Sequence, residues 1–321
     1  MGRRGARAAV DLDGFVVLDK PAGMTSHDVV ARCRRVLDQP RAGHAGTLDP
    51  DATGVLVVGL GSATRLMRFA TGLEKSYVGE LVLGTATSTL DSSGEVVATY
   101  DMSGVTLEQV RAAAAELTGP IRQIPPMVSA VRVGGRRLHE IARAGGVVER
   151  ESRAVEVARF DVEATTRGDV FTIAVDCSSG TYVRALAADV GAALGGGAHL
   201  RALRRTAIGM FAVETAVPLE ALGQADVRPS RELVAHLATV ATPPAIAEQV
   251  VHGRVLDRRE LGVLGAGPWA VTGADGVLLA VYEAWREDKA KPTVVVARPA
   301  ARADQADESV REPAGGGAER D

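Results

Sequence analysis

The chain has 321 residues, of which 46% are hydrophobic, and it carries a formal net charge of −3. A chain of this size can bury one large core and a second small one, so we expect a large domain plus a smaller module. Residues 301–321 hold six acidic residues and three arginines, which account for the whole net charge and leave the preceding body neutral. No segment approaches the roughly 18 uninterrupted apolar residues of a membrane helix, so we expect a cytoplasmic protein.

The two cysteines, Cys33 and Cys177, are far apart and belong to no Cys-x-x-Cys pair. This spacing argues against a disulfide framework and against a zinc site, so we expect two core thiols and no bound metal.

In chain order, the apolar runs at residues 16–18 and 55–58 are bounded by glycine and predict buried strands. Between them, apolar residues recur at helical spacing after Ser26 and predict a helix. The stretch that follows, residues 41–50, combines glycines, a histidine and one carboxylate, and we expect it to be an irregular loop.

Asp49 is the candidate nucleophile of this loop. Gly43 and Gly46 let the backbone turn or approach a ligand, and Pro50 biases Asp49 toward an extended conformation. The plainer alternative is a turn closed by an Asx hydrogen bond.

Further along, residues 77–83, 95–100 and 170–176 predict strands. The Thr106-x-x-Gln109 pattern predicts a capped helix that ends near Gly119-Pro120. Glycine pairs, two prolines and several arginines in residues 120–152 predict an excursion from the core, which is followed by a turn at 178–181 and a helix at 182–194.

After about residue 240, short β-like runs at 269–271, 277–282 and 293–297 predict a small β-rich module. We expect the basic residues 1–11 to be flexible and residues 299–321 to be a disordered tail, because neither segment has apolar periodicity.

Arginines gather in three places along the neutral body, and such clusters are typical of RNA-binding surfaces. A solvated protein face is the alternative for any single cluster. The clusters are Arg32, Arg34, Arg35 and Arg41; Arg132, Arg136, Arg137 and Arg143; and Arg201, Arg204 and Arg205.

Two competing motifs lack their context. Residues 11–14 read Asp-Leu-Asp-Gly, as in aspartate phosphatases, but no buried strand precedes them and no later motif supplies magnesium ligands. Residues 59–61 read Gly-Leu-Gly without the third glycine of a dinucleotide loop.

Two motifs together carry a family resemblance. Residues 19–26 read Asp-Lys-Pro-Ala-Gly-Met-Thr-Ser, and residues 43–50 read Gly-His-Ala-Gly-Thr-Leu-Asp-Pro. With Thr-Tyr-Val-Arg at residues 181–184, they resemble the TruB-type tRNA pseudouridine synthases, standalone bacterial enzymes that isomerise the uridine at position 55 of the tRNA T-loop. The resemblance spans roughly residues 12–298.

The resemblance implies an α+β pseudouridine synthase fold with a mixed, largely antiparallel sheet flanked by helices. The catalytic domain would span residues 12–238, with an RNA-clasping insertion at about 120–152, and a PUA-like RNA-binding module would span residues 239–298. The implied partner is the T-arm of tRNA, and neither a cofactor nor a protein partner is required, which is consistent with a monomer.

The resemblance also assigns residues. Asp49 would add to C6 of the uracil or to C1′ of the ribose, or assist a glycal route. His44 would fill the space that the flipped nucleotides leave. Tyr77 would stack on the uracil unless it is plain strand core, and Arg184 would pair with Asp49. The remaining substrate-binding residues would be Tyr182, Leu203, Lys20 and Arg41. The residues that bind RNA would be Arg136, Arg137, Arg204 and Arg205.

Two positions depart from the family pattern: His139 replaces a usual tyrosine and Ser88 a frequent aspartate. Two other functions stay open, a guide-RNA-dependent pseudouridine synthase and an RNA-binding protein that helps tRNA to fold, with catalysis secondary.

Overall fold

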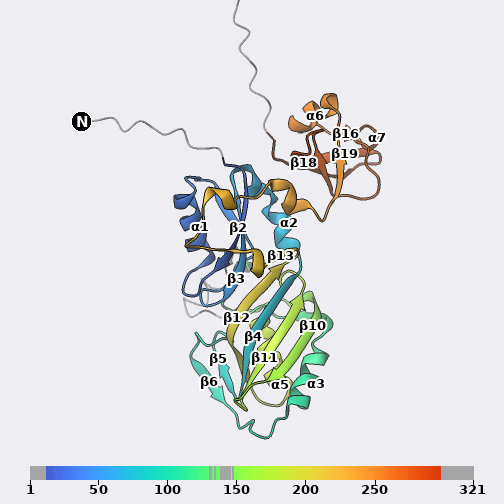
Figure 1. Cartoon of the computed structure of the whole chain (residues 1–321). Coiled ribbons are helices and arrows are strands. Elements are labelled where there is room, and N and C mark those ends of the chain that lie inside the picture. The colour runs from blue at the N-terminus through green and yellow to red at the C-terminus, as the bar shows by residue number, and fades with distance from the viewer. Residues whose placement is uncertain (1–11, 130–131, 134, 138–145, 147, 298–321) are drawn as a thin grey trace, which may run out of the picture.

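Figure 1 shows the computed structural model of the chain, which describes residues 12–129, 132–133, 135–137, 146 and 148–297. A large mixed sheet forms the body of the molecule, and a smaller β-rich domain sits beyond one end of it. The two units correspond to the large domain and the small module that length and composition predict.

The first half of the chain contains β1 (Gly14–Lys20), α1 (Ser26–Val36), β2 (Ala42–Ala45), β3 (Thr53–Leu60), the 3-10 helix η1 (Gly61–Leu66), α2 (Met67–Gly72), β4 (Lys75–Leu83), β5 (Thr85–Thr87), β6 (Val96–Thr99), α3 (Leu107–Glu116), β7 (Gly119–Gln123), β8 (Arg132–Val133), β9 (Arg136–Arg137) and β10 (Arg153–Ala164). The second half contains β11 (Val170–Cys177), α5 (Val183–Ala193), β12 (Ala198–Ile208), β13 (Phe211–Ala212), η2 (Val213–Thr215), β14 (Val217–Pro218), η3 (Gln224–Asp226), η4 (Ser230–Val234), β15 (Ala238–Ala241), α6 (Pro244–Val251), β16 (Leu256–Asp257), α7 (Arg258–Leu261), β17 (Trp269–Thr272), β18 (Leu278–Trp285) and β19 (Lys289–Val295).

The large sheet has ten strands in the order β14-β1-β3-β12-β4-β11-β10-β7, with β2 paired to β3 and β13 to β12. Only the β1–β14 and β3–β12 pairs in it are parallel. The prediction of a mixed, largely antiparallel sheet flanked by helices is therefore confirmed.

Helices cover different parts of this sheet. Helix α1 buries Val29, Val30 and Cys33 against β1 and β3, while α3 and α5 pack on the β4, β10 and β11 region. Both helices begin at a capping box, of which the sequence analysis predicted the second: Thr25 caps α1 with Asp28, and Thr106 caps α3 with Gln109. Local sequence thus sets where these helices begin, and their apolar faces determine where they pack.

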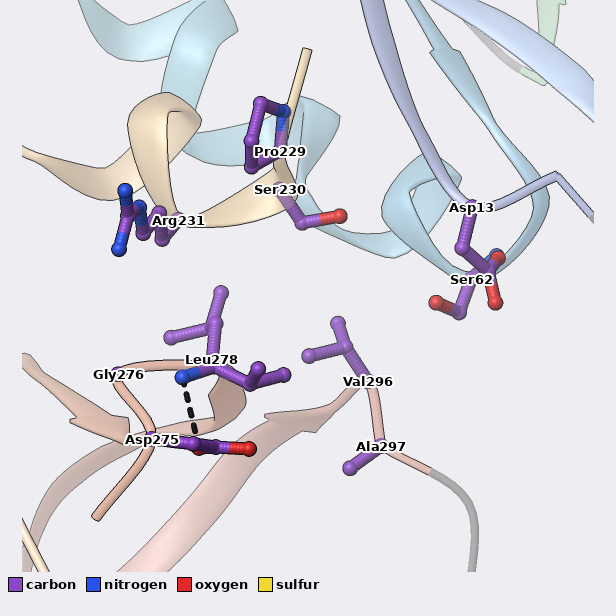
Figure 2. A pocket seen from close by; sticks show the side chains of 11 residues that line it. Asp13, Ser62, Pro229, Ser230, Arg231, Asp275, Gly276, Leu278, Val296 and Ala297 are labelled. Carbon is purple, nitrogen blue, oxygen red and sulfur yellow. Dashed lines mark hydrogen bonds between the residues drawn. The ribbon is translucent and has the colours of Figure 1, made fainter. Parts of the chain in front are cut away.

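The small domain is built on the sheet β15-β17-β18-β19-β16, and its core surrounds Trp269 and Tyr282. A hydrophobic cluster that includes Leu233 and Val234 of η4 joins it to the large domain. Beside this contact lies a cleft of about 550 Å³, with η4 on one wall and the β17–β18 turn on the other (Figure 2). Among the predicted site residues whose side chains the structure describes, none lines that cleft.

Several sequence predictions of secondary structure were wrong. Residues 42–45 of the expected loop form strand β2, since they pair with β3 from Ala42↔Leu60 to Ala45↔Val57. The excursion from the core was expected to begin at residue 120. That start is too early, because Gly119–Gln123 forms the edge strand β7, which pairs with β10. The sequence analysis also missed β10 and β12.

The expectation of two core thiols agrees with the structure. Cys33 and Cys177 are buried free thiols. Within the described ranges, no helix is long and apolar enough to cross a membrane.

The parallel contact between β3 and β12 is short and tight. It rests on the register pairs Arg204↔Thr53 and Arg205↔Gly54. A Cβ atom added at Gly54 would lie 2.1 Å from the Arg205 carbonyl oxygen, and the φ of Gly54 is +101°. Only glycine fits this position, because both the backbone angle and the neighbouring strand exclude a side chain.

We therefore expect Gly54→Ala to lower the free energy of unfolding by about 2–4 kcal/mol, measured by urea denaturation. Gly72→Ala is the matched control, because a Cβ atom there meets no atom within 4 Å and alanine favours the α2 helix. Equal unfolding midpoints for the Gly54 variant and the wild type would contradict the tight strand contact.

Candidate active site

The segment that carries Asp49 is held mainly through its backbone. The Lys20 ammonium donates to the carbonyl oxygens of Pro21 and Pro50 at 2.8 Å each. The Ser26 hydroxyl donates to the Leu48 carbonyl at 3.2 Å and accepts from the Leu48 amide at 2.9 Å. These contacts leave the Asp49 carboxylate itself free to face outward.

Arg205 lies behind the same segment. Its guanidinium donates to the carbonyl oxygens of Val55 at 2.8 Å and Gly46 at 3.0 Å, and only 1% of the residue is exposed. Arg205 is thus a structural residue of this segment, although it also lines a hollow beside Asp49 and Tyr77, and its contact with RNA stays a prediction.

Lys20 is likewise a structural residue and not a substrate contact, because it is fully buried. Burial lowers the pKa of its ammonium to about 8, and the nearby carboxylates of Asp51 and Asp49 oppose that shift. Its position explains why the Asp-Lys-Pro motif accompanies the Asp49 motif in the sequence, since each holds the other in place.

Arg184 supplies the charge partner of Asp49. Its Nε lies 3.3 Å from the Asp49 carboxylate, and its Nη1 lies 3.2 Å from the carboxylate of Asp91. The guanidinium also donates to the carbonyl oxygens of Thr89 and Val128, at 3.2 and 2.8 Å. Only 5% of Arg184 is exposed, so this cation is fixed by groups from several segments.

The Asp49 side chain keeps 45% of its surface exposed. Burial of its surroundings raises the pKa of the carboxyl above the ordinary value, Arg184 opposes that rise, and Asp91 adds to it. The pairing predicted from sequence is present, but it does not lower the pKa as a simple ion pair would.

Two hollows meet at Asp49, Arg184 and Leu203. One, of about 270 Å³, is lined by Tyr77, Tyr182, Lys75 and the 178–181 turn among others, and the second, of about 180 Å³, by Asp91 and Val128 among others. The sequence prediction that this turn faces the same cleft as Asp49 agrees with the structure.

Tyr77 is 8% exposed on β4 and lines the larger hollow. Burial is the main cause that raises the pKa of its hydroxyl, and Arg205 opposes it. Its ring therefore belongs both to the core and to the wall of the site, so the two sequence readings of Tyr77 are compatible.

His44 lies in β2, five residues before Asp49. Its ring meets the ring of His27 edge to face, with centroids 5.2 Å apart. Burial, followed by His27 and Arg205, lowers the pKa of His44 to about 4, so it is neutral at neutral pH. Among the described residues its Nδ1 has no hydrogen-bond partner.

The remaining predicted residues lie elsewhere. Arg41 is exposed and lines neither hollow. Arg204 pairs with Asp19 at 2.6 Å on β12, and Arg201 pairs with Glu80 at 2.7 Å. Of this third arginine cluster on β12 only Arg205 is buried; Arg201 is exposed and lines the smaller hollow beside Asp49, and RNA binding by Arg204 stays a prediction.

The backbone of Arg136 and Arg137 forms β9, whereas their side chains and His139 lie outside what the structure describes. Sequence reasoning assigned no role to Asp91, Lys75 or Gln123. Within the described ranges, no group of three or more histidine, cysteine or carboxylate side chains could hold a metal ion. Asp13, from the phosphatase-like motif, accepts a hydrogen bond from the Ser62 amide at the start of η1.

Comparisons with known proteins show the family of the chain. The N-terminal domain of TruB family pseudouridylate synthases matches residues 34–183, and the C-terminal domain of tRNA pseudouridylate synthase B matches residues 184–242. The tRNA pseudouridine synthase B of Mycobacterium sp. (strain KMS) is 47% identical over 295 residues, covering 89% of this chain and 97% of that protein. That of Mycobacterium tuberculosis (strain ATCC 25618 / H37Rv) is 43% identical over 296 residues, covering 89% and 96%.

Among solved structures, a Cbf5-Nop10-Gar1 complex gives a TM-score of 0.71 at 28% identity, covering 90% of this chain and 86% of that chain. An H/ACA RNP bound to a substrate RNA containing 2′-deoxyuridine gives 0.69 at 26% identity, covering 90% and 87%. On the strength of its curated relatives, the chain belongs to the TruB family of tRNA pseudouridine synthases, and it is an isomerase that makes pseudouridine in tRNA.

Proposed function

We propose that this enzyme isomerises the uridine at position 55 of the tRNA T-loop, with Asp49 as the nucleophile. The observation that carries the proposal is the Asp49 carboxylate, exposed at the junction of two hollows and paired with the buried guanidinium of Arg184. A reactive acid in an accessible pocket, fixed by a buried cation, suits covalent catalysis.

The reaction breaks the bond between C1′ and N1 and forms a bond between C1′ and C5, after which C5 loses its proton and N1 gains one. Asp49 would hold the intermediate while the base turns, and Arg184 would orient its carboxylate. Tyr77 and Leu203 line the hollow into which the uracil would enter. The electrons balance within the substrate, so the step needs no redox partner.

The target base must leave the T-loop stack before Asp49 can reach it. We propose that His44 fills the space it leaves. A carboxylate needs no general base to become a nucleophile, and a histidine with a pKa of about 4 carries no charge at neutral pH. A neutral flat ring backed by His27 suits a wedge between bases.

We propose an RNA-binding surface that runs from the active site to the small domain along η1 and α2. Arg65 and Arg68 are exposed there and make no ion pair with any described residue. They line a cleft of about 370 Å³ with residues 292–295 of β19. Arg136 and Arg137 would add phosphate contacts from the insertion, and the small domain would bind RNA beside Arg65 and Arg68.

The two alternative functions predict different experimental results. A guide-RNA-dependent enzyme would leave bare unmodified tRNA unchanged, whereas we expect pseudouridine at position 55 when purified protein and tRNA are the only macromolecules. A protein whose main task is tRNA folding would retain its effect on tRNA folding after Asp49 is replaced.

For the nucleophile, we expect Asp49→Asn to abolish isomerisation and to leave tRNA affinity within a small factor, because the amide has nearly the same size but cannot form the adduct. Pseudouridine mapping and filter binding measure the two quantities. Asp51→Asn, an exposed acid in the same loop, is the matched control and should stay within a few-fold of wild type. Turnover by the Asp49 variant near the wild-type rate would reject the assignment.

The pH dependence follows from the raised pKa of Asp49. Only the ionised carboxylate is nucleophilic, so the single-turnover rate should fall on acidification at a pH above the ordinary aspartate value of about 3.9. Arg184→Gln removes a cation that lowers this pKa and should move the acid limb to higher pH. Asp91→Asn removes a carboxylate that raises it and should move the limb to lower pH. Shifts in the same direction for both variants would contradict this electrostatic account.

For the RNA surface, we expect replacement of both Arg65 and Arg68 by glutamine to weaken tRNA binding and to reduce the log–log salt slope of the affinity by about one to two units. Arg159→Gln is the control, since two carboxylates already balance that exposed arginine. The rate at saturating tRNA should remain near wild type. An unchanged salt slope in the double variant would remove these arginines from the RNA path.

A further inference from the structure

Helix α5, which carries Arg184, begins in an unusual way. Its N-cap residue Tyr182 has an extended backbone and provides no side-chain capping hydrogen bond. The first turn needs external support, because the amide groups at a helix start have no partner within the helix. That support comes from a residue 59 positions earlier in the chain.

The side chain of Gln123 forms two hydrogen bonds with the backbone of Tyr182. Its Oε1 accepts from the Tyr182 amide at 2.7 Å, and its Nε2 donates to the Tyr182 carbonyl at 3.1 Å. Gln123 is the last residue of β7 and only 3% exposed. One planar amide thus fixes both polar backbone groups of the residue that starts α5.

The chain that leaves Gln123 touches α5 a second time. Five residues on, the carbonyl of Val128 accepts a hydrogen bond from Arg184 Nη2 at 2.8 Å. The carbonyl of Pro125, between them, accepts from Arg150 Nη1 at 3.0 Å. The segment that leads into the insertion is therefore bonded both to the start of α5 and to the cation that faces Asp49.

We propose that Gln123 is a positioning residue for isomerisation, which fixes the first turn of α5 and thereby holds the Arg184 guanidinium against Asp49. The inference rests on the proposed role of Asp49. Arg184 is two residues beyond Tyr182, so rotation of this first turn displaces the guanidinium from a carboxylate that it meets at 3.3 Å. A small displacement of the charged partner lowers the reaction rate, because the orientation of the reacting carboxylate depends on the position of that partner.

The test uses the difference between an amide and a carboxyl group. Gln123→Glu keeps the shape, but an ionised glutamate cannot donate to the Tyr182 carbonyl, whereas a protonated one can both donate to it and accept from the Tyr182 amide. At about pH 8 we expect a single-turnover rate about 10- to 100-fold below wild type, with tRNA affinity nearly unchanged. The ratio of variant to wild-type rate should rise toward one as the pH falls to about 5.

The described contacts place three cations around the segment that holds this side chain: Arg184 on α5, Arg150 at Pro125, and Arg153 opposite Gln123 on β10. These cations favour the ionised form of the introduced glutamate, and burial opposes it. The two effects set the pH at which the rate ratio changes, but not the direction of that change. A ratio that stays constant with pH, or a wild-type rate at about pH 8, would overturn the proposal.

Two further variants distinguish a loss of the positioning role from a loss of folding. Gln123→Met matches the size without either hydrogen bond, and its rate should be reduced at every pH while its melting temperature shows that it is folded. Arg122→Ala is the control, since it removes two hydrogen bonds to Ser152 from the neighbouring position of β7. A full rate in a folded Gln123→Met protein would reject the positioning role.

The path of the effect is tested in an Arg184→Lys background. If Gln123 acts through Arg184, Gln123→Glu should reduce the rate much less there than in the wild type. If Gln123→Glu lowered the rate by the same factor in both backgrounds, Gln123 would act independently of Arg184, and the proposal would be overturned. Activity of Asp49→Asn would instead refute the proposed nucleophile, so the two failures are distinct.

Discussion

The structure depends above all on one buried guanidinium. A guanidinium in a protein interior is destabilising unless its donors are satisfied, and Arg184 achieves this with groups from separate parts of the chain. Asp49, Asp91 and the carbonyls of Thr89 and Val128 all converge on it. The folding requirement of one cation thus assembles the active site, and each partner constrains the others.

The carboxylate and its supporting segment are held in different ways. Buried cations bind the segment through main-chain carbonyl oxygens, as Lys20 does at Pro50 and Arg205 at Gly46, and neither neutralises the Asp49 side chain directly. Arg184 is shared with Asp91, and burial keeps the pKa of Asp49 above its ordinary value. A carboxylate that is fixed in place yet only partly neutralised stays basic enough to attack carbon.

Sequence reasoning found the parts of the fold that local physics determines. Helical spacing after Ser26 and the Thr106-x-x-Gln109 pattern predict the starts of α1 and α3, and the Asp49 and Arg184 motifs indicate the site and its pairing. It failed at β12, where arginines on a central strand resemble an exposed basic cluster. Arg205 is tolerated there only because carbonyl groups distant in sequence satisfy it, and no local pattern reveals such partners.

The same limit applies to Gln123. A single polar residue at the end of an edge strand gives no periodic or spacing signal, and its importance appears only when the start of α5 is placed beside it. Residues that bond to backbone atoms of distant segments are invisible to motif analysis, because their partners have no side-chain identity. Asp49, the proposed nucleophile, could be found from sequence, whereas most of the residues that support it could not.

The parallel contact between β3 and β12 joins two largely antiparallel halves of the large sheet through two register pairs. Asp49 precedes β3 on one half, while Tyr77 and Arg184 belong to the other. The residues that line the hollow at Asp49 therefore come from both sides of this strand contact, so their spacing depends on how the two halves of the sheet are joined. Gly54 packs against the Arg205 backbone, and the Arg205 guanidinium donates to the Val55 carbonyl, so both contacts join β3 to β12. The rigidity of this strand pair therefore limits how much the two sides of the site can move relative to each other.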